Sequence, residues 1–257
     1  MPLAVCLADI RQQVAAGARH ITFGDPDFLN GPTHALRVAR ALHEEFPEVT
    51  FDFTAKVEHL LRRRALLPEL HDLGCLFIVT AVESLSEAVL THLDKGHSRA
   101  DVAAALRAVR DAGITLRPTW VAFTPWTTLA DYRAMLDFVE AEDLIDHVDP
   151  VQYALRLLVP PGSLLLDSPA MRPHLGGLVE TELSHRWTHP DPRMEDLHLR
   201  VTALVTEAAE GKEDPSITFA RVREQADAAA GLRARPAGPG LLPDRWRPPR
   251  LTEPWFC

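Results

Sequence analysis

The sequence predicts an α/β protein built around an incomplete parallel (β/α) barrel, with C-terminal helices and an extended tail. Short apolar runs alternate with amphipathic stretches of helical length, as in βαβ units. Five such apolar runs precede a change of pattern at Val159–Ser163. The chain also opens on a helical pattern, Leu3–Ala16, whereas a complete barrel opens on a strand.

In the first half of the chain, each expected element is bounded by residues that favour turns or helix ends. Gly17 ends the first helix. Apolar runs rich in β-branched and aromatic residues predict strands at His20–Phe23, Val49–Thr54 and Cys75–Val79. Amphipathic periodicity predicts helices at Thr33–Phe46, across most of Leu60–Leu73, and at Ala100–Ala112, and a short helix that ends at the Lys95–His97 turn lies before the last of these.

The second half continues the alternation and then departs from it. We expect a strand at Thr115–Phe123, a helix at Leu129–Glu142, a last strand at His147–Leu155, and helices at Met194–Ala209 and Ser216–Ala230. Arg233–Pro254 is rich in Pro and Arg and indicates an extended arm or a disordered tail. The predicted domains are a partial barrel over 1–168, a helical extension over 169–232 and a tail over 233–257.

Composition excludes several classes of protein. The net charge of −9 argues against a general nucleic-acid binder, and no apolar run approaches the ~18 residues of a membrane span. The first residues lack the basic start of a signal peptide. Cys6, Cys75 and Cys257 are too scattered for a disulfide framework, so we expect a cytoplasmic protein. Substrate and oligomeric state stay open.

Polar residues after the first predicted strand form the first candidate site. Gly24 allows close approach of a ligand to the backbone, and Asp25 and Asp27 are able to accept hydrogen bonds from an ammonium group. A capped turn before a helix explains the same residues. Lys56 follows the second strand, where it would pair with a carboxylate or remain solvated; nearby His59 is interpreted as a surface or helix-cap residue.

The third and fourth strands carry the other candidates. Glu83 and Ser84 follow an apolar strand, although a serine here also suits the N-cap of the next helix. Lys95–His97 is interpreted as a helix C-cap with glycine. Arg117 lies within a strand expected to be buried on both faces, so it must be paired or point into the barrel.

The run Thr80–Ser84 (TAVES), followed by Leu93–His97 (LDKGH) and the helix to Gly113, resembles the radical SAM superfamily, particularly its branch related to cobalamin-binding members. The resemblance extends over about Leu7–Leu166. A narrower resemblance is to the group named for a CUAEP or CCAEP tail, where U is selenocysteine. Its basis is the following set of segments: His20–Phe28, Val57–Leu61, Phe123–Thr128, Arg156–Pro160 and Glu253–Cys257.

The resemblance implies binding of S-adenosylmethionine through residues at the strand ends: Gly24, Asp25, Asp27, Lys56, Glu83, Ser84 and Arg117. It also implies a [4Fe–4S] cluster in the full-length protein, held by three cysteines spaced C-x3-C-x2-C after the first strand. No two cysteines of this chain are close in sequence, so we expect a fragment that lacks the first strand and the cluster loop, and is inactive alone. Cys257 would then belong to a redox-active tail that continues beyond it.

Two rival interpretations belong to other classes. A non-catalytic α/β barrel would bind a small ligand or a partner without ever holding a cluster. A weaker alternative is an aldolase-like barrel that forms a Schiff base through Lys56.

Overall fold

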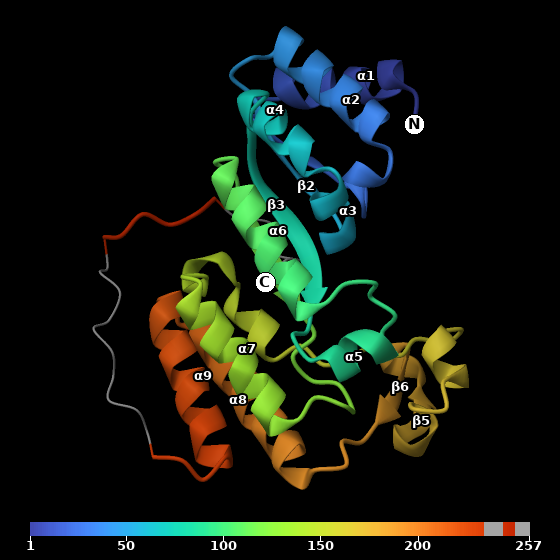
Figure 1. Ribbon diagram of the computed structural model, residues 1–257, viewed down its shortest axis with the longest axis vertical. Helices are drawn as coiled ribbons and strands as arrows, with labels where there is room; N and C mark the ends of the chain where they lie inside the picture. Colours follow the sequence, from blue (N-terminus) through green and yellow to red (C-terminus); the bar gives the residue numbers. More distant parts are fainter. Residues whose placement is uncertain (234–243, 250–257) are drawn as a thin grey trace. The chain divides into compact units, whose positions relative to one another are not determined.

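The structure, a computed structural model, describes residues 1–233 and 244–249. Clustering of contacts divides the chain into two compact units, whose elements are labelled in Figure 1. Unit 1 comprises Met1–Val82 and His97–Thr119, with Pro248 and Pro249. Unit 2 comprises Glu83–Gly96 and the described residues of Trp120–Arg247.

The centre of unit 1 is a parallel sheet with the strand order β1-β2-β3-β4. Its strands are β1 (His20–Phe23), β2 (Thr50–Thr54), β3 (Cys75–Glu83) and β4 (Thr115–Trp120). Only the last residues of β3 and β4 fall in unit 2. Within the part of the chain that the structure describes, β1 pairs with β2 alone, so the other side of β1 is a free edge.

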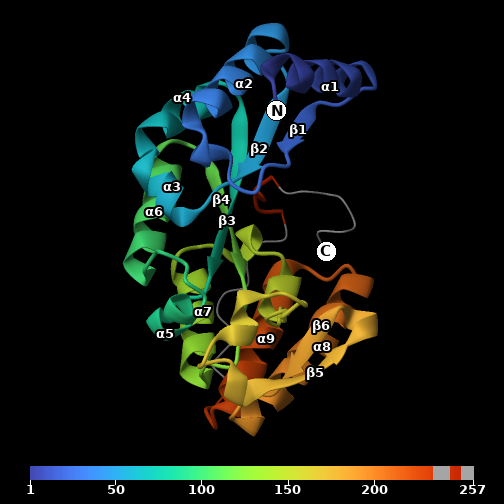
Figure 2. The same cartoon turned by 90° about the vertical axis from the view of Figure 1, so that its right-hand side faces the viewer.

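Helices cover one face of this sheet (Figure 2). They are α2 (Pro32–Glu45), α3 (Val57–Arg62), α4 (Leu67–Asp72) and α6 (Arg99–Asp111), while α1 (Leu3–Ala15) packs against α2. Helix α2 has Pro32 in its first turn, where the missing N–H costs nothing. Helix α6 begins at a capping box in which Ser98 and Asp101 exchange side-chain-to-backbone hydrogen bonds.

Side chains alternate between the two faces of the sheet, and this alternation builds the core. Phe51 and Phe53 of β2 are fully buried on the face that contacts Phe23 and Phe28. Ring centroids lie 4.9 Å apart for Phe23 and Phe28, and 4.8 Å apart for Phe28 and Phe53. Asp52, between the two phenylalanines, points to the opposite face.

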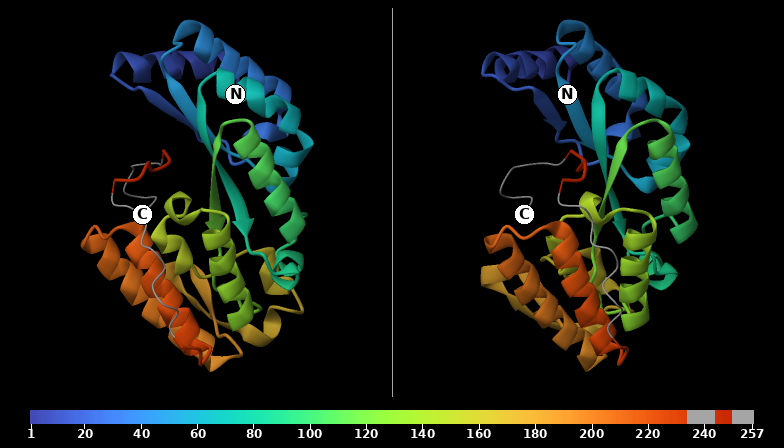
Figure 3. Two further views of the ribbon diagram at one scale, coloured as in Figure 1. Left: turned by 60° about the vertical axis from the view of Figure 1, so that its left-hand side comes forward. Right: turned by 90° about the vertical axis from the view of Figure 1, so that its left-hand side faces the viewer.

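Unit 2 contains α5 (Glu87–His92), α7 (Leu129–Ala141), α8 (Pro192–Glu210) and α9 (Pro215–Ala229), with an antiparallel hairpin of β5 (Leu175–Val179) and β6 (Ser184–Trp187). Helix α9 lies beside both α7 and α8 (Figures 1 and 3). Buried Asp227 of α9 accepts a 2.8 Å hydrogen bond from Arg133 of α7. Arg223 of α9 forms ion pairs with Asp137 and Glu140 of α7 in the same interface.

Short 3₁₀ helices complete the described elements. They are Phe28–Asn30, Arg64–Leu66, Ile145–His147, Pro150–Tyr153, Leu164–Asp167, Arg172–His174 and Glu180–Glu182. None of the helices in the described residues is long and apolar enough to cross a bilayer.

The predicted last strand at His147–Leu155 is wrong. Two 3₁₀ helices occupy most of this range, and the second begins at Pro150, whose fixed φ suits the first turn of a helix. Parallel pairing occurs one residue later, as a single bridge between Phe123 and Arg156. The described sheet therefore has four strands where the sequence predicts five.

Other elements differ from the expectations in their extent. The helix expected across Leu60–Leu73 is divided into α3, a 3₁₀ turn and α4, because Pro68 lacks the N–H that would continue the earlier turn. Strand β3 runs four residues past Val79, which makes Glu83 its last residue. The β5–β6 hairpin lies in the segment that was expected to be helical, where two adjacent glycines hide the strand pattern.

Candidate functional site

The loop after β1 places two carboxylates at the carboxyl end of the sheet. Asp25 Oδ1 accepts a 2.8 Å hydrogen bond from the backbone N–H of Asp27, which is the geometry of an Asx turn. The capped-turn interpretation of this loop is therefore present in the structure. It uses one oxygen of Asp25, whose residue is exposed. At Gly24, a Cβ atom would meet nothing within 4 Å, so the backbone there is open to close approach.

Asp27 joins this loop to the segment that follows β2. Its Oδ1 accepts a 3.3 Å hydrogen bond from the backbone N–H of Lys56, and its Oδ2 lies 2.6 Å from Nδ1 of His59. The side chains of Asp27 and His59 are 11% and 14% exposed. The ends of β1 and β2 are adjacent in the sheet, and this adjacency explains why residues about 30 positions apart meet.

His59 contacts a predicted site residue, Asp27, and the sequence did not suggest this contact. The interpretation as a surface residue or helix cap treated it as one polar residue in a helical pattern. One feature of the sequence could have indicated this contact: His59 lies in the first helical turn after β2. In barrels, the residues that bind ligands and catalyse reactions lie at this carboxyl edge of the strands. Lys56 contacts Asp27 through its backbone, and its residue is exposed, which agrees with the solvated alternative for its side chain.

Unit 2 holds the second group of predicted residues, at the end of β3. Glu83 has a φ of +64°, a left-handed conformation that is strained for a residue other than glycine. Its Oε1 lies 3.2 Å from Nζ of Lys95, and both side chains are about four-fifths buried at 19% and 21% exposure. Lys95 is therefore more than part of a helix C-cap.

Ser84 is buried, and its hydroxyl accepts a 3.1 Å hydrogen bond from the backbone N–H of Ser86. Ser86 holds the N-cap position of α5, and its own side chain makes no capping hydrogen bond. Ser84 thus stabilises the turn that leads into the helix, but the side-chain N-cap that the structural interpretation predicts is not formed.

Arg117 of β4 is buried at 5% exposure, and its Nη1 donates a 3.2 Å hydrogen bond to the carbonyl of Pro249 within unit 1. The expectation that this guanidinium must have a partner is confirmed.

Unit 1 also contains a pocket of about 480 Å³ between α1, β1 and α2. Ile10, Ile21 and Phe28 supply apolar walls, and Asp9 and Asp25 supply carboxylates at its lining. This pocket adjoins the Gly24–Asp27 loop and the free edge of β1. It therefore offers apolar walls with a few polar groups, a combination typical of small-molecule sites.

The cysteines of the described residues do not fit a [4Fe–4S] cluster. Cys75 is buried within β3, where burial, reinforced by the nearby Asp52 carboxylate, raises the pKa of its thiol well above the usual value. A thiol of this kind is a poor source of the thiolate that iron requires. Cys6 lies on α1, and the described residues hold no group of three potential metal ligands. Cys257 lies outside the described residues.

A second polar cluster that the sequence did not suggest lies on the sheet itself. His20 Nε2 is 2.8 Å from Asp52 Oδ1, and His20 Nδ1 is 2.8 Å from Thr50 Oγ1, while Thr22 donates a 2.7 Å hydrogen bond to Asp52. Both ring nitrogens of His20 are engaged. His20 begins β1, away from the carboxyl end of the strands, so we interpret the cluster as stabilising the pairing of β1 with β2.

No protein-family model and no curated protein matches the chain. Solved structures do match it. The cobalamin-dependent S-adenosylmethionine radical enzyme OxsB, with aqua-cobalamin bound, aligns at a TM-score of 0.62 and 18% identity, over 80% of this chain and 36% of that chain. The same enzyme with aqua-cobalamin and S-adenosylmethionine bound aligns at 0.59 and 18% identity, over 75% of this chain and 34% of that chain.

The chain thus spans about a third of the length of OxsB. At this level of identity, the likeness shows the fold. The parallel sheet and its covering helices match part of a radical SAM (β/α) barrel, as the sequence predicts.

Proposed function

We propose that this chain is the S-adenosylmethionine-binding part of a radical SAM enzyme whose cluster ligands lie outside these 257 residues. The fold supports the superfamily, and the resemblance in the Thr80–Ser84 and Leu93–His97 segments supports the same assignment independently. The observation that carries the proposal is the polar group at the carboxyl ends of β1 and β2, where this fold class keeps its ligands.

The residues of unit 1 fit the cofactor in their chemistry. Asp25 has a carboxylate oxygen beyond the one used in its turn, and a carboxylate is a strong acceptor for the ammonium group of S-adenosylmethionine. The exposed ammonium of Lys56 would suit its carboxylate. Gly24 leaves the backbone open to close approach. Glu83, Ser84 and Arg117 remain proposed cofactor contacts on the basis of the resemblance.

The cluster would supply the electron that starts radical chemistry. Because Cys6 and Cys75 do not fit it, we expect the isolated chain to bind the cofactor without cleaving it. Cys257 keeps its proposed role in a redox-active tail, which sequencing of the codons that follow it in the gene would test.

Equilibrium dialysis of S-adenosylmethionine against the purified chain tests the proposal. We expect saturable binding by the wild type and about 10- to 100-fold weaker binding by Asp25→Asn and by Glu83→Ala, because each removes a charged hydrogen bond worth about 1.5–3 kcal/mol. Asp72→Asn is the matched control, since that carboxylate is 80% exposed on α4. No 5′-deoxyadenosine should form.

Absence of binding by the wild type would contradict the proposal and favour a non-catalytic barrel for another ligand. The Schiff-base alternative is disfavoured by the structure, because Lys56 is exposed whereas such lysines are activated by desolvation or by a neighbouring cation. Failure of borohydride to trap an adduct at Lys56 with aldehydes or ketones would exclude it.

A further inference from the structure

Asp27 and His59 form a carboxylate–imidazole pair at the carboxyl edge of the sheet. The 2.6 Å separation of Asp27 Oδ2 and His59 Nδ1 is short, and both side chains are nearly nine-tenths buried. Charge-assisted hydrogen bonds are the short and strong ones, and limited solvent access strengthens them further. The pair therefore fixes the orientation of the imidazole ring.

Both carboxylate oxygens of Asp27 already accept hydrogen bonds from the protein. Oδ1 receives the backbone N–H of Lys56, and Oδ2 receives the ring N–H of His59. An ionised carboxylate only accepts hydrogen bonds, so Nδ1 of His59 must carry the proton. Asp27 is therefore a poor candidate for direct contact with an ammonium group, in contrast to Asp25.

These hydrogen bonds leave Nε2 of His59 with an unshared electron pair. Across residues 1–233 and 244–249, the structure shows no hydrogen bond to this atom, and Nε2 is not among the fully enclosed polar atoms that lack a partner. A neutral histidine whose Nδ1–H is held by a carboxylate is a common arrangement for a group that accepts protons or hydrogen bonds at Nε2.

We infer that His59 is the ligand-facing acceptor of this site and that Asp27 is its positioning residue. The ligand class is a molecule that presents an ammonium or hydroxyl group, and S-adenosylmethionine carries both; this assignment of the ligand rests on the proposed function. Before any proton transfer, the N–H or O–H group of the ligand donates a hydrogen bond to Nε2 of His59. Where the proton transfers, the donor keeps the bonding electron pair, a new N–H bond forms at Nε2, and Asp27 stabilises the imidazolium.

Two measurements on the full chain test the inference. Long-range ¹H–¹⁵N spectra of the histidine rings report which nitrogen carries the proton. We expect His59 in the Nδ1–H form, and we expect its Nε2 resonance to shift when S-adenosylmethionine is added. In Asp27→Ala the ring should lose its single tautomer.

The matched variant is His59→Asn. Its amide nitrogen lies close to the position of Nδ1 and keeps a donor for Asp27, but nothing replaces Nε2. We expect an unchanged fold and cofactor binding weakened by about 3- to 10-fold, the loss of one neutral hydrogen bond of about 0.5–1.5 kcal/mol. His71→Asn, on the exposed surface of α4, is the control and should bind as the wild type does.

The outcomes separate the two proposals. If the wild type binds S-adenosylmethionine but His59→Asn binds equally well and Nε2 does not shift, the inference is wrong and the proposed function stands. If His59 is found in the Nε2–H form, the positioning role of Asp27 is wrong. If the wild type does not bind the cofactor, the proposed function fails, and the assignment of this ligand to His59 fails with it.

Discussion

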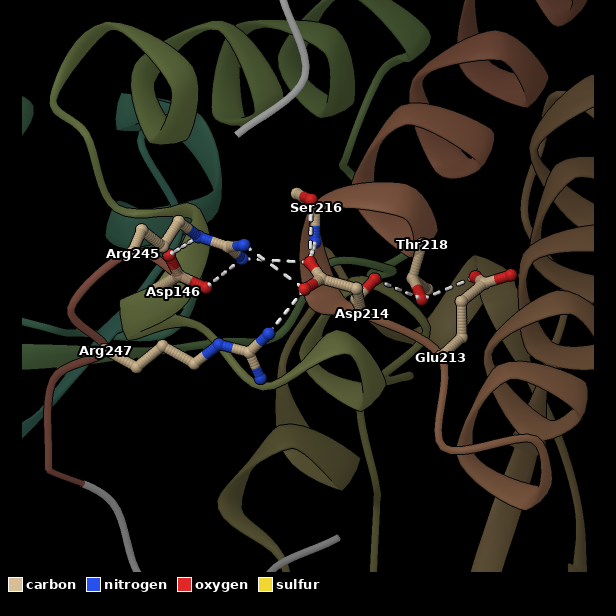
Figure 4. A network of polar contacts seen from close by, with 7 residues as sticks. All are labelled: Asp146, Glu213, Asp214, Ser216, Thr218, Arg245 and Arg247. Carbon is tan, nitrogen blue, oxygen red and sulfur yellow. Dashed lines mark hydrogen bonds and ion pairs between the residues drawn. The ribbon is translucent and has the colours of Figure 1, made fainter. Parts of the chain in front are cut away.

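The Asp27–His59 pair of unit 1 and the cluster of Arg245, Asp146 and Asp214 in unit 2 (the Arg245 cluster) both contain largely buried carboxylates. Within the described residues, they differ in the hydrogen-bonding atoms that have no partner. Figure 4 shows Arg245 between Asp146 and Asp214. Its guanidinium donates to both oxygens of Asp146, at 2.5 and 2.6 Å, and to both oxygens of Asp214, at 2.9 and 3.2 Å. Arg247 and Ser216 add further donors to Asp214.

This contrast separates a structural cluster from a candidate site. In the Arg245 cluster, the guanidinium fork is matched to the oxygens of two carboxylates, and Asp214 also accepts hydrogen bonds from Arg247 and Ser216. The hydrogen bonds from Arg245 hold the pKa of Asp214 well below its usual value, and the hydrogen bonds to Asp146 first, and to Asp214 next, raise the pKa of Arg245. In the Asp27–His59 pair, by contrast, one acceptor atom is left over. Our proposal for the site rests on this acceptor atom rather than on burial or charge alone.

The largest expected effect on stability is that of Arg245→Ala. The variant leaves Asp146, which is 12% exposed, without its main cation, so we expect the free energy of unfolding at pH 7 to fall by about 3 kcal/mol. Urea denaturation measures the change. Arg247→Ala is the control: its side chain is 45% exposed, and we expect a loss of less than about 1 kcal/mol. Equal losses of unfolding free energy in Arg245→Ala and Arg247→Ala would mean that the buried ion pairs of Arg245 are not what stabilises this cluster.

The effect of Arg245→Ala should also depend on pH. Because the pKa of Asp214 is lowered in the folded state, its stabilisation is complete above its unfolded-state pKa of about 3.9 and is lost as the pH falls toward the folded value. The difference between the wild type and the variant should therefore be full at neutral pH and shrink below about pH 4. A difference that grows in acid would contradict this assignment of the ion pair.

A smaller loss is expected for Asp27→Ala. The variant leaves the ring N–H of His59 and the backbone N–H of Lys56 without their acceptor, which we expect to cost about 1–2 kcal/mol in urea denaturation. Unlike Arg245→Ala, it should also weaken cofactor binding. A variant that loses stability while its cofactor affinity stays unchanged would place Asp27 with the structural cluster.

The smallest expected effect concerns the backbone at Glu83. Its φ of +64° costs a residue with a side chain about 1 kcal/mol, and glycine avoids this cost. We therefore expect Glu83→Gly to be more stable than Glu83→Ala by about 1 kcal/mol in thermal denaturation, with the same loss of cofactor affinity. Equal stability of the two variants would mean that the strand end relaxes and that Glu83 is not strained.

The sequence predicted the elements whose signals are local. Helix α6 was expected from its periodicity, and Gly24, Asp25 and Asp27 were placed at the end of a strand because an apolar run precedes them. The strand expected at His147–Leu155 failed because its apolar residues suit a 3₁₀ turn equally well once Pro150 fixes the backbone.

The parts that were missed depend on residues far apart in the chain. Arg245 lies 99 positions from Asp146 and 31 from Asp214, and no spacing in the sequence links them. The Pro/Arg-rich composition of its surroundings predicts an extended arm or a disordered tail. His59 was set aside because its partner, Asp27, is 32 positions away and meets it only after β1 and β2 pair.

The central claim is that the ligand site lies at the Gly24–Asp27 loop and His59, and that the Arg245 cluster is structural. A map of NMR chemical-shift changes, recorded as S-adenosylmethionine is added to saturation, tests it most directly. The account predicts that large changes include Gly24, Asp25 and the His59 ring, with no comparable change at Asp214 or Arg245. Changes centred on Asp214 and Arg245, or no change at the Gly24–Asp27 loop when binding is complete, would contradict it.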